Sequence, residues 1–134
     1  MSIAGTYVHY HTINPEEFLK AVGNHLSREN IIGFTTTVST LRWSVRDDVY
    51  TLSATIGPFW ERRIKFRIGV PFIEGEGEVI TIAERYDNVF LLTSITMCGR
   101  IIRRAYAFDD CEVVVILDLG NGKLGKRYYK KTYT

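Results

Sequence analysis

The sequence predicts an all-β fold: a ten-stranded antiparallel up-and-down β-barrel, or β-clam, with a short helix-turn-helix lid between its first two strands. Two observations predict it. From residue 34 to the end of the 134-residue chain, the sequence consists of short apolar or alternating segments typical of strands. The residues that separate these segments are those typical of tight turns. Tight connections make neighbouring strands antiparallel, and a long meander closes because closure removes its exposed edges. The length is that of a single domain, residues 1–134.

The first strand is predicted at residues 6–11, where side chains alternate between two faces. His9 and His11 would then share one face. Two such imidazoles are conceivable metal ligands, but the sequence shows no third ligand beside them, so no metal site is predicted. Lining of a polar interior or simple surface exposure is the plainer interpretation of both residues.

The helical part follows directly. Asn14 is a favourable N-cap and Pro15 a favourable first residue for a helix that ends at Gly23. A second short helix is predicted over residues 24–31. Together they form the predicted lid.

Nine further strands are predicted, at residues 34–45, 49–56, 62–68, 70–73, 79–84, 89–97, 100–108, 112–119 and 123–132. The acids that begin at Glu74 are predicted to lie in a solvated turn. Arg63, Lys65 and Arg67 alternate with apolar residues and form either a solvated strand face or a basic stripe that approaches anionic membranes. If Arg42 faces inward in the second strand, the interior holds an additional cation and suits a more polar ligand.

Composition narrows the function classes. Hydrophobic residues make up 46% of the chain and charged residues 24%, which is typical of a globular protein and not of a disordered one. A formal net charge of +2 does not favour nucleic-acid binding by bulk attraction. The first residues show no secretory signal, and Cys98 and Cys111 are predicted to be free thiols at opposite ends of one strand. A reducing, cytoplasmic location is therefore expected.

The last strand raises the functional question. Arg127 and Tyr129 share one face, and the residues between and beside them share the other. Whichever face points inward, it buries a cation, and a buried cation needs an anion. That anion is either an internal acid such as Glu112 or Asp118, or the head group of a ligand.

The order of elements and several short motifs resemble the intracellular lipid-binding proteins, the fatty-acid-binding and cellular retinoid-binding group. The resemblance covers nearly the whole chain, although no single motif is specific. The motifs are Gly5-Thr6-Tyr7, the helix from Glu17 to Gly23, the segment from Arg63 to Phe72, and Arg127-Tyr128-Tyr129-Lys130. His9 and His11 depart from the family pattern, so the chain resembles a divergent member.

The resemblance implies a water-containing cavity that holds one lipid, whose carboxylate meets two arginines and a tyrosine. Arg127 and Tyr129 match the family's Arg-x-Tyr element. The second arginine is assigned to Arg104, and an alternative register would point Arg103 inward instead.

The resemblance also implies an entrance framed by the second helix and the neighbouring turns. Phe59 matches a portal aromatic, and Phe18, Leu26 and Ile31 would line the helical lid.

The function expected from these features is that of a non-catalytic, monomeric carrier of a long-chain fatty acid or similar hydrophobic carboxylate. It would need no cofactor, bind no nucleic acid, and contact anionic membranes transiently. A retinoid or bile-acid carrier is the alternative within the same fold. A small barrel enzyme that uses His9 or His11 as acid–base is the less favoured alternative, because no nucleophile–base set is evident.

Overall fold

The structure, a computed structural model, describes residues 3–22, 39–56, 60–74 and 79–132. Its elements are β1 (Gly5–Ile13), α1 (Pro15–Val22), β2 (Ser39–Arg46), β3 (Val49–Ile56), β4 (Trp60–Phe66), β5 (Phe72–Glu74), β6 (Val79–Tyr86), β7 (Val89–Thr96), β8 (Ile101–Phe108), β9 (Glu112–Asp118) and β10 (Leu124–Lys131). The predicted fold class of ten antiparallel strands is confirmed. The second predicted helix lies outside the described residues.

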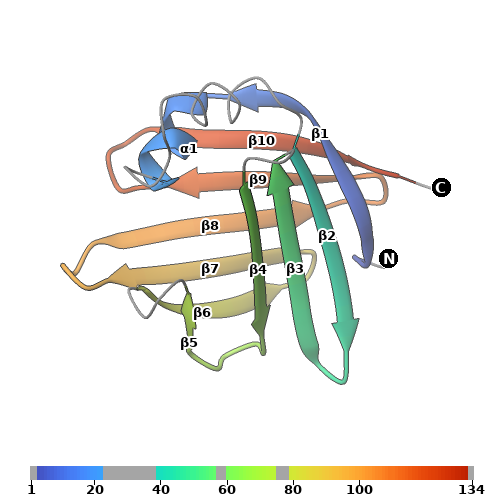
Figure 1. The fold of residues 1–134 in the computed structure, drawn as a ribbon, viewed down its shortest axis with the longest axis horizontal. Helices are drawn as coiled ribbons and strands as arrows, with labels where there is room; N and C mark the ends of the chain where they lie inside the picture. The colour runs from blue at the N-terminus through green and yellow to red at the C-terminus, as the bar shows by residue number, and fades with distance from the viewer. Residues whose placement is uncertain (1–2, 23–38, 57–59, 75–78, 133–134) are drawn as a thin grey trace.

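All ten strands belong to one nearly closed sheet. Strands that follow one another in sequence pair antiparallel, except β4 and β5, and β1 pairs with β10. The order β4-β3-β2-β1-β10-β9-β8-β7-β6-β5 leaves β4 and β5 at the two edges. In Figure 1, β2, β3 and β4 run steeply across β7, β8 and β9, as expected when a twisted sheet curls on itself. Beyond β4, the amide of Gly69 donates to the carbonyl of Ala83 at 2.8 Å and ties the β4–β5 connection to β6.

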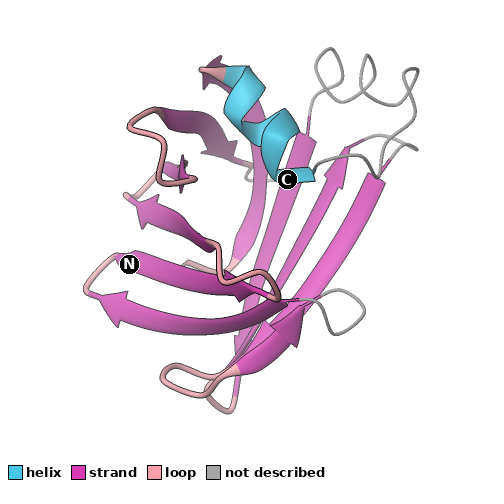
Figure 2. Ribbon diagram, turned by 90° about the vertical axis from the view of Figure 1, so that its left-hand side faces the viewer, coloured by secondary structure: helices cyan, strands magenta, loops and turns pink. Residues whose placement is uncertain are grey.

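Helix α1 lies over one end of the barrel (Figure 2). Asn14 precedes it in a left-handed conformation, with φ of 51°, and its side-chain amide donates to the carbonyl of Leu124 at 2.9 Å. The helix packs against Gly125 of β10, where an added Cβ would lie only 2.7 Å from the Phe18 ring. The missing side chain therefore permits the close approach of α1 to β10. We call this end of the barrel the helix end and the other the far end.

The inner face of the barrel changes character along its axis. Toward the far end it is aromatic: the Trp43 ring centroid lies 5.1 Å from that of Tyr106 and 5.2 Å from that of Phe108. Toward the helix end the buried inner positions become polar, with Ser39, Glu74, Thr81, Ser94 and Arg127. Aromatic packing thus closes one end, and charged and hydroxyl groups occupy the other half.

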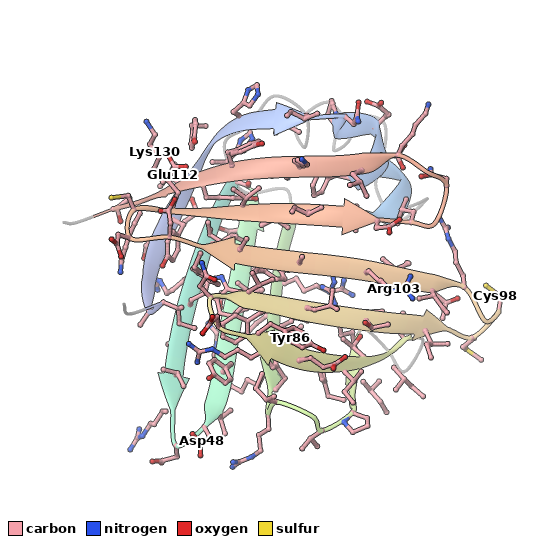
Figure 3. All side chains as sticks on the ribbon, turned by 180° about the vertical axis from the view of Figure 1, so that it is seen from behind. Asp48, Tyr86, Cys98, Arg103, Glu112 and Lys130 are labelled. Carbon is pink, nitrogen blue, oxygen red and sulfur yellow. The ribbon has the colours of Figure 1, made fainter. Side chains whose placement is uncertain are left out.

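The two cysteines and the β2–β3 turn agree with what the local sequence predicts. Cys98 and Cys111 are exposed free thiols, and Figure 3 shows Cys98 at the tip of the β7–β8 hairpin, far from Glu112, the neighbour of Cys111. Asp47 and Asp48 have φ of 52° and 63° in the β2–β3 turn, a conformation that aspartate tolerates. Within the described residues, no helix has the length and apolar character needed to cross a bilayer.

Candidate functional site

Strand β10 directs its cation and its phenol into the barrel. Arg127 is 7% exposed and Tyr129 3% exposed, whereas Lys130 on the other face is exposed. The Tyr129 hydroxyl is 2.8 Å from the hydroxyl of Ser39 on β2. The Arg127 guanidinium carbon lies 5.5 Å from the Phe18 ring centroid and 5.9 Å from that of Tyr129, within cation–π range. The guanidinium is therefore held beside two aromatic rings.

Burial changes the ionisation of both groups. It lowers the pKa of the Arg127 guanidinium, and Tyr129 opposes part of that change. It raises the pKa of the Tyr129 phenol, against the smaller influence of Arg127 and Ser39. Both shifts disfavour charge in a desolvated position, so a bound anion would stabilise the arginine cation.

Strand β8 directs Arg104 inward and Arg103 outward. Arg104 lies opposite Leu92 of β7 and Leu117 of β9, both buried, while Arg103 is exposed on the outer face (Figure 3). The Arg104 side chain is 18% exposed, and its Nη2 lies 2.6 Å from Oε2 of Glu74. The protein itself thus supplies an anion for this interior arginine.

The expectation that Glu74 belongs to a solvated turn is wrong. Glu74 ends β5, is 4% exposed, and accepts hydrogen bonds at Oε2 from the hydroxyls of Thr81 and Ser94 as well as from Arg104. Burial alone would raise the pKa of its carboxyl group, but Arg104, Thr81 and Arg62 hold the pKa below its usual value. Alternation in the sequence could have predicted the burial of Glu74, because Phe72 and Glu74 lie on the same face of one strand.

Glu74 changes what the second predicted arginine can do. Burial alone would lower the pKa of Arg104, yet Tyr106 and Glu74 together raise it. Among the described residues, Oε1 of Glu74 is buried without a hydrogen-bond partner. Arg104 is therefore a cation in the wall of the interior that is paired with Glu74. The second carboxylate oxygen of Glu74 can still accept a hydrogen bond.

The two histidines do not share a face, because a β-bulge separates them. His9 lies opposite Tyr129, and His11 lies opposite Tyr128 on the outer side. The bulge shifts the alternation by one residue, which a period-two pattern cannot reveal. His9 Nε2 is hydrogen-bonded to the hydroxyl of Thr12. Burial, followed by the charge of Arg127, lowers the His9 pKa to about 4, so its imidazole is neutral at neutral pH.

From the sequence, Arg42 could face inward and add a further cation to the interior. This possibility is wrong. Ser39, Leu41 and Trp43 are the buried side chains of β2, so Arg42 points outward and is exposed. The additional interior cation proposed for a more polar ligand is therefore not supplied by β2.

Of the four side chains assigned to the lid and portal, Phe18 is described and lies between Gly125 and Arg127. Leu26, Ile31 and Phe59 lie outside the described residues. A partly open pocket of about 340 Å³ lies at the far end, lined by Asp48, Tyr50, Arg67, Ile68 and Val70. It contains none of the predicted site residues.

The interior groups form an arrangement suited to recognition of an anion. Arg127 offers a planar fork of donors, and Tyr129 and Ser39 offer hydroxyls, all from the helix-end half of the inner face. In the described part of the chain, no cluster of three or more His, Cys, Asp or Glu side chains could hold a metal ion. The interior side chains named above can form hydrogen bonds and charge pairs.

Comparison with solved structures identifies the fold. A fatty-acid-binding protein from the brain of Drosophila melanogaster superposes with a TM-score of 0.82 at 25% identity, covering 96% of this chain and 99% of its own. The fold is that of the fatty-acid-binding proteins. The fatty-acid-binding protein of Manduca sexta matches with a TM-score of 0.74 at 25% identity, covering 96% of this chain and 99% of its own.

Lipid-binding protein 8 of Caenorhabditis elegans shares the fatty-acid-binding-protein fold with a TM-score of 0.81 at 17% identity, covering 98% of this chain and 99% of its own. No protein-family model and no curated protein matches the sequence. The likeness thus lies in the architecture.

Proposed function

We propose that this protein is a non-catalytic intracellular carrier of a long-chain fatty acid or a similar hydrophobic carboxylate, held inside the barrel. The head group contacts Arg127 and Tyr129, with Arg104 nearby in the wall. The single observation that carries the proposal is the buried Arg127–Tyr129 face of β10, inside a fold shared with named fatty-acid-binding proteins. Exposed free thiols agree with a reducing compartment.

Head and tail contribute differently to this binding. A carboxylate can take paired hydrogen bonds from the Arg127 guanidinium and one from a tyrosine hydroxyl, which fixes its orientation. An alkyl tail gains roughly 0.8 kcal/mol for each buried methylene, or about 10 kcal/mol before ordering costs for about a dozen carbons. The tail supplies most of the affinity, and the arginine selects for a carboxylate.

The test is displacement of a fluorescent fatty acid from delipidated protein by oleate and, separately, by methyl oleate. Arg127→Leu is expected to weaken oleate binding by about 10- to 100-fold, because a charge-assisted hydrogen bond is lost. Binding of methyl oleate is expected to change by less than about twofold, since the ester carries no charge to recognise.

Lys126→Leu is the matched control, because it removes one positive charge from the adjacent, outward-facing position of β10. It is expected to leave the affinity for both lipids unchanged. Equal losses for oleate and its ester in Arg127→Leu would show that the residue is structural. Failure of every lipid to displace the probe from wild-type protein would reject the carrier function.

A further inference from the structure

The buried carboxylate of Glu74 is hydrogen-bonded through one of its two oxygens only. Oε2 accepts from Nη2 of Arg104 at 2.6 Å, from the hydroxyl of Ser94 at 3.3 Å and from the hydroxyl of Thr81. Among the described residues, Oε1 has no hydrogen-bond partner, although the side chain is only 3% exposed. Nearly all buried polar groups in proteins are hydrogen-bonded, and an acceptor left without a partner costs free energy. Oε1 is therefore an acceptor that a bound molecule can complete.

The hydroxyls beside Glu74 are already engaged on the other oxygen. Thr81 donates its single hydroxyl proton to Oε2, so in its 2.7 Å contact with Ser94 it is Ser94 that donates. The Ser94 proton is thus shared between Thr81 and Oε2. Neither hydroxyl has a proton left for Oε1, so the missing donor has to come from a water molecule or from a ligand.

The charge of this cluster selects the kind of donor. Burial raises the pKa of the Glu74 carboxyl, but Arg104 and Thr81 together hold the pKa below its usual value, so the group is ionised at neutral pH. Arg104 balances that charge. A ligand cation would be repelled by Arg104, and a second ligand anion by Glu74. An uncharged donor such as a hydroxyl meets neither repulsion, and its hydrogen bond to a charged acceptor is stronger than one to a neutral acceptor.

The cluster is separated from the proposed head-group site along the barrel wall. In the sheet order, β5, which carries Glu74, is the fifth strand from β10, which carries Arg127 and Tyr129. Neighbouring strands lie about 4.8 Å apart, so roughly 24 Å of curved wall separates Glu74 from those two residues. A ligand whose carboxylate contacts Arg127 therefore meets Glu74 with a part of its chain that is remote from the carboxylate.

We propose that Glu74 is a second recognition group of the interior, and that the preferred ligand is a long-chain acid with a hydroxyl group remote from its carboxylate. The hydroxyl donates to Oε1 of Glu74, while Arg127 and Tyr129 hold the carboxylate. Arg104 and its neighbouring hydroxyls fix the Glu74 side chain through Oε2. This inference rests on the proposed carrier function and narrows its ligand from fatty acids in general to hydroxylated ones.

The experiment measures displacement of a fluorescent fatty acid from the delipidated full chain by four unlabelled acids. They are oleate and three oleates with one added hydroxyl, placed beside the carboxylate, in the middle of the chain or at its methyl end. At least one of the two remote hydroxyls is expected to strengthen binding by about tenfold over oleate. The hydroxyl beside the carboxylate is expected to change the affinity by less than about threefold, because it cannot reach Glu74.

The double variant Glu74→Gln/Arg104→Gln replaces the ion pair by two neutral amides. Its preference for the remote hydroxyl over oleate is expected to fall below about threefold, because the charged acceptor is gone. Glu61→Gln/Arg103→Gln is the matched control, since it makes the same two changes at exposed positions of β4 and β8, and it should keep the full preference. Arg127→Leu is expected to weaken all four acids by a similar factor, which leaves the preference unchanged.

The outcomes separate this inference from the carrier function. Equal affinities for all four acids in wild-type protein would overturn the inference, because water would then serve Oε1 whatever the ligand. Retention of the preference in Glu74→Gln/Arg104→Gln would overturn it as well. In both cases oleate still binds, so the carrier function stands. Failure of every acid to displace the probe would reject the carrier function and this inference with it. The wild-type comparison decides the matter even if the double variant does not fold.

Discussion

At the scale of single residues, the pair Arg104 and Glu74 decides how the interior is charged. Each side chain alone would be a desolvated charge, and together they meet at 2.6 Å with two hydroxyls completing the contact. A buried pair adds little over an apolar substitute, but removal of one partner leaves the other uncompensated. The carboxylate therefore allows this arginine to remain inside when no ligand is bound.

Glu74→Gln is expected to lower the free energy of unfolding at neutral pH by about 3 kcal/mol, because Arg104 loses its counter-charge. Urea denaturation measures the change. Glu61→Gln, at an exposed position of β4, is the control and is expected to change stability by less than about 0.5 kcal/mol. Addition of Arg104→Gln to Glu74→Gln is expected to recover part of the loss, and a strictly additive double variant would contradict the pairing.

The same pair predicts a pH dependence. The pKa of Glu74 is lower in the folded protein than its ordinary value of 4.5, so the unfolded chain binds the proton more tightly. The stabilisation is present above the unfolded pKa and is lost as pH falls through the folded pKa. Wild-type stability should therefore decline more steeply than that of Glu74→Gln between about pH 5 and pH 3.

At the scale of elements, α1 and β10 depend on each other. Gly125 removes a side chain where the Phe18 ring lies, and the Phe18 ring in turn lies 5.5 Å from the Arg127 guanidinium carbon. Glu17 is fully buried beside the same glycine and accepts a hydrogen bond from Asn121 at 2.9 Å. The position of the helix is thus linked to the surroundings of the proposed head-group site.

Gly125→Ala is expected to displace the Phe18 ring and to cost about 1–3 kcal/mol, as overpacking of a tight contact does. Urea denaturation gives the stability, and amide chemical shifts of α1 report the displacement. Lys123→Ala, an exposed neighbour in the turn, should leave both unchanged. Unaltered α1 shifts in Gly125→Ala would show that the helix does not rest on this glycine.

At the scale of the whole molecule, the barrel has one seam. β4 pairs only with β3, and β5 only with β6, within the described sheet. The other eight strands have hydrogen-bonded neighbours on both sides. Backbone groups that face the seam lack a ladder partner, so this side of the wall is the most readily opened.

Hydrogen exchange followed by mass spectrometry tests this inference. A peptide that covers β4 is expected to exchange at least about tenfold faster than one that covers β8, which has partners on both sides. Strand β3, paired on both sides and adjacent to β4, is the internal control. Equal protection of β4 and β8 would mean that hydrogen bonds close the seam in solution.

Where the structure describes the chain, the predicted strands agree with it to within a few residues, because alternation and turn residues are local signals; the start of the second predicted strand, residues 34–38, lies outside the described residues. Arg127 and Tyr129 were assigned to one face by alternation alone, and the structure places that face inside. Two errors came from the ends and irregularities of strands: β5 extends to Glu74, and a bulge reverses the face of His11. A single inserted residue changes every later assignment on a strand.

The sequence by itself determined the number, order and direction of the strands, because turn chemistry and two-residue periodicity are encoded within a few neighbouring residues. Only the tertiary structure decided that Glu74 meets Arg104, thirty positions away, and that its other carboxylate oxygen has no partner among the described residues. The physical reason is register. Contacts between strands depend on how the sheet aligns and curls, and no local pattern contains that alignment.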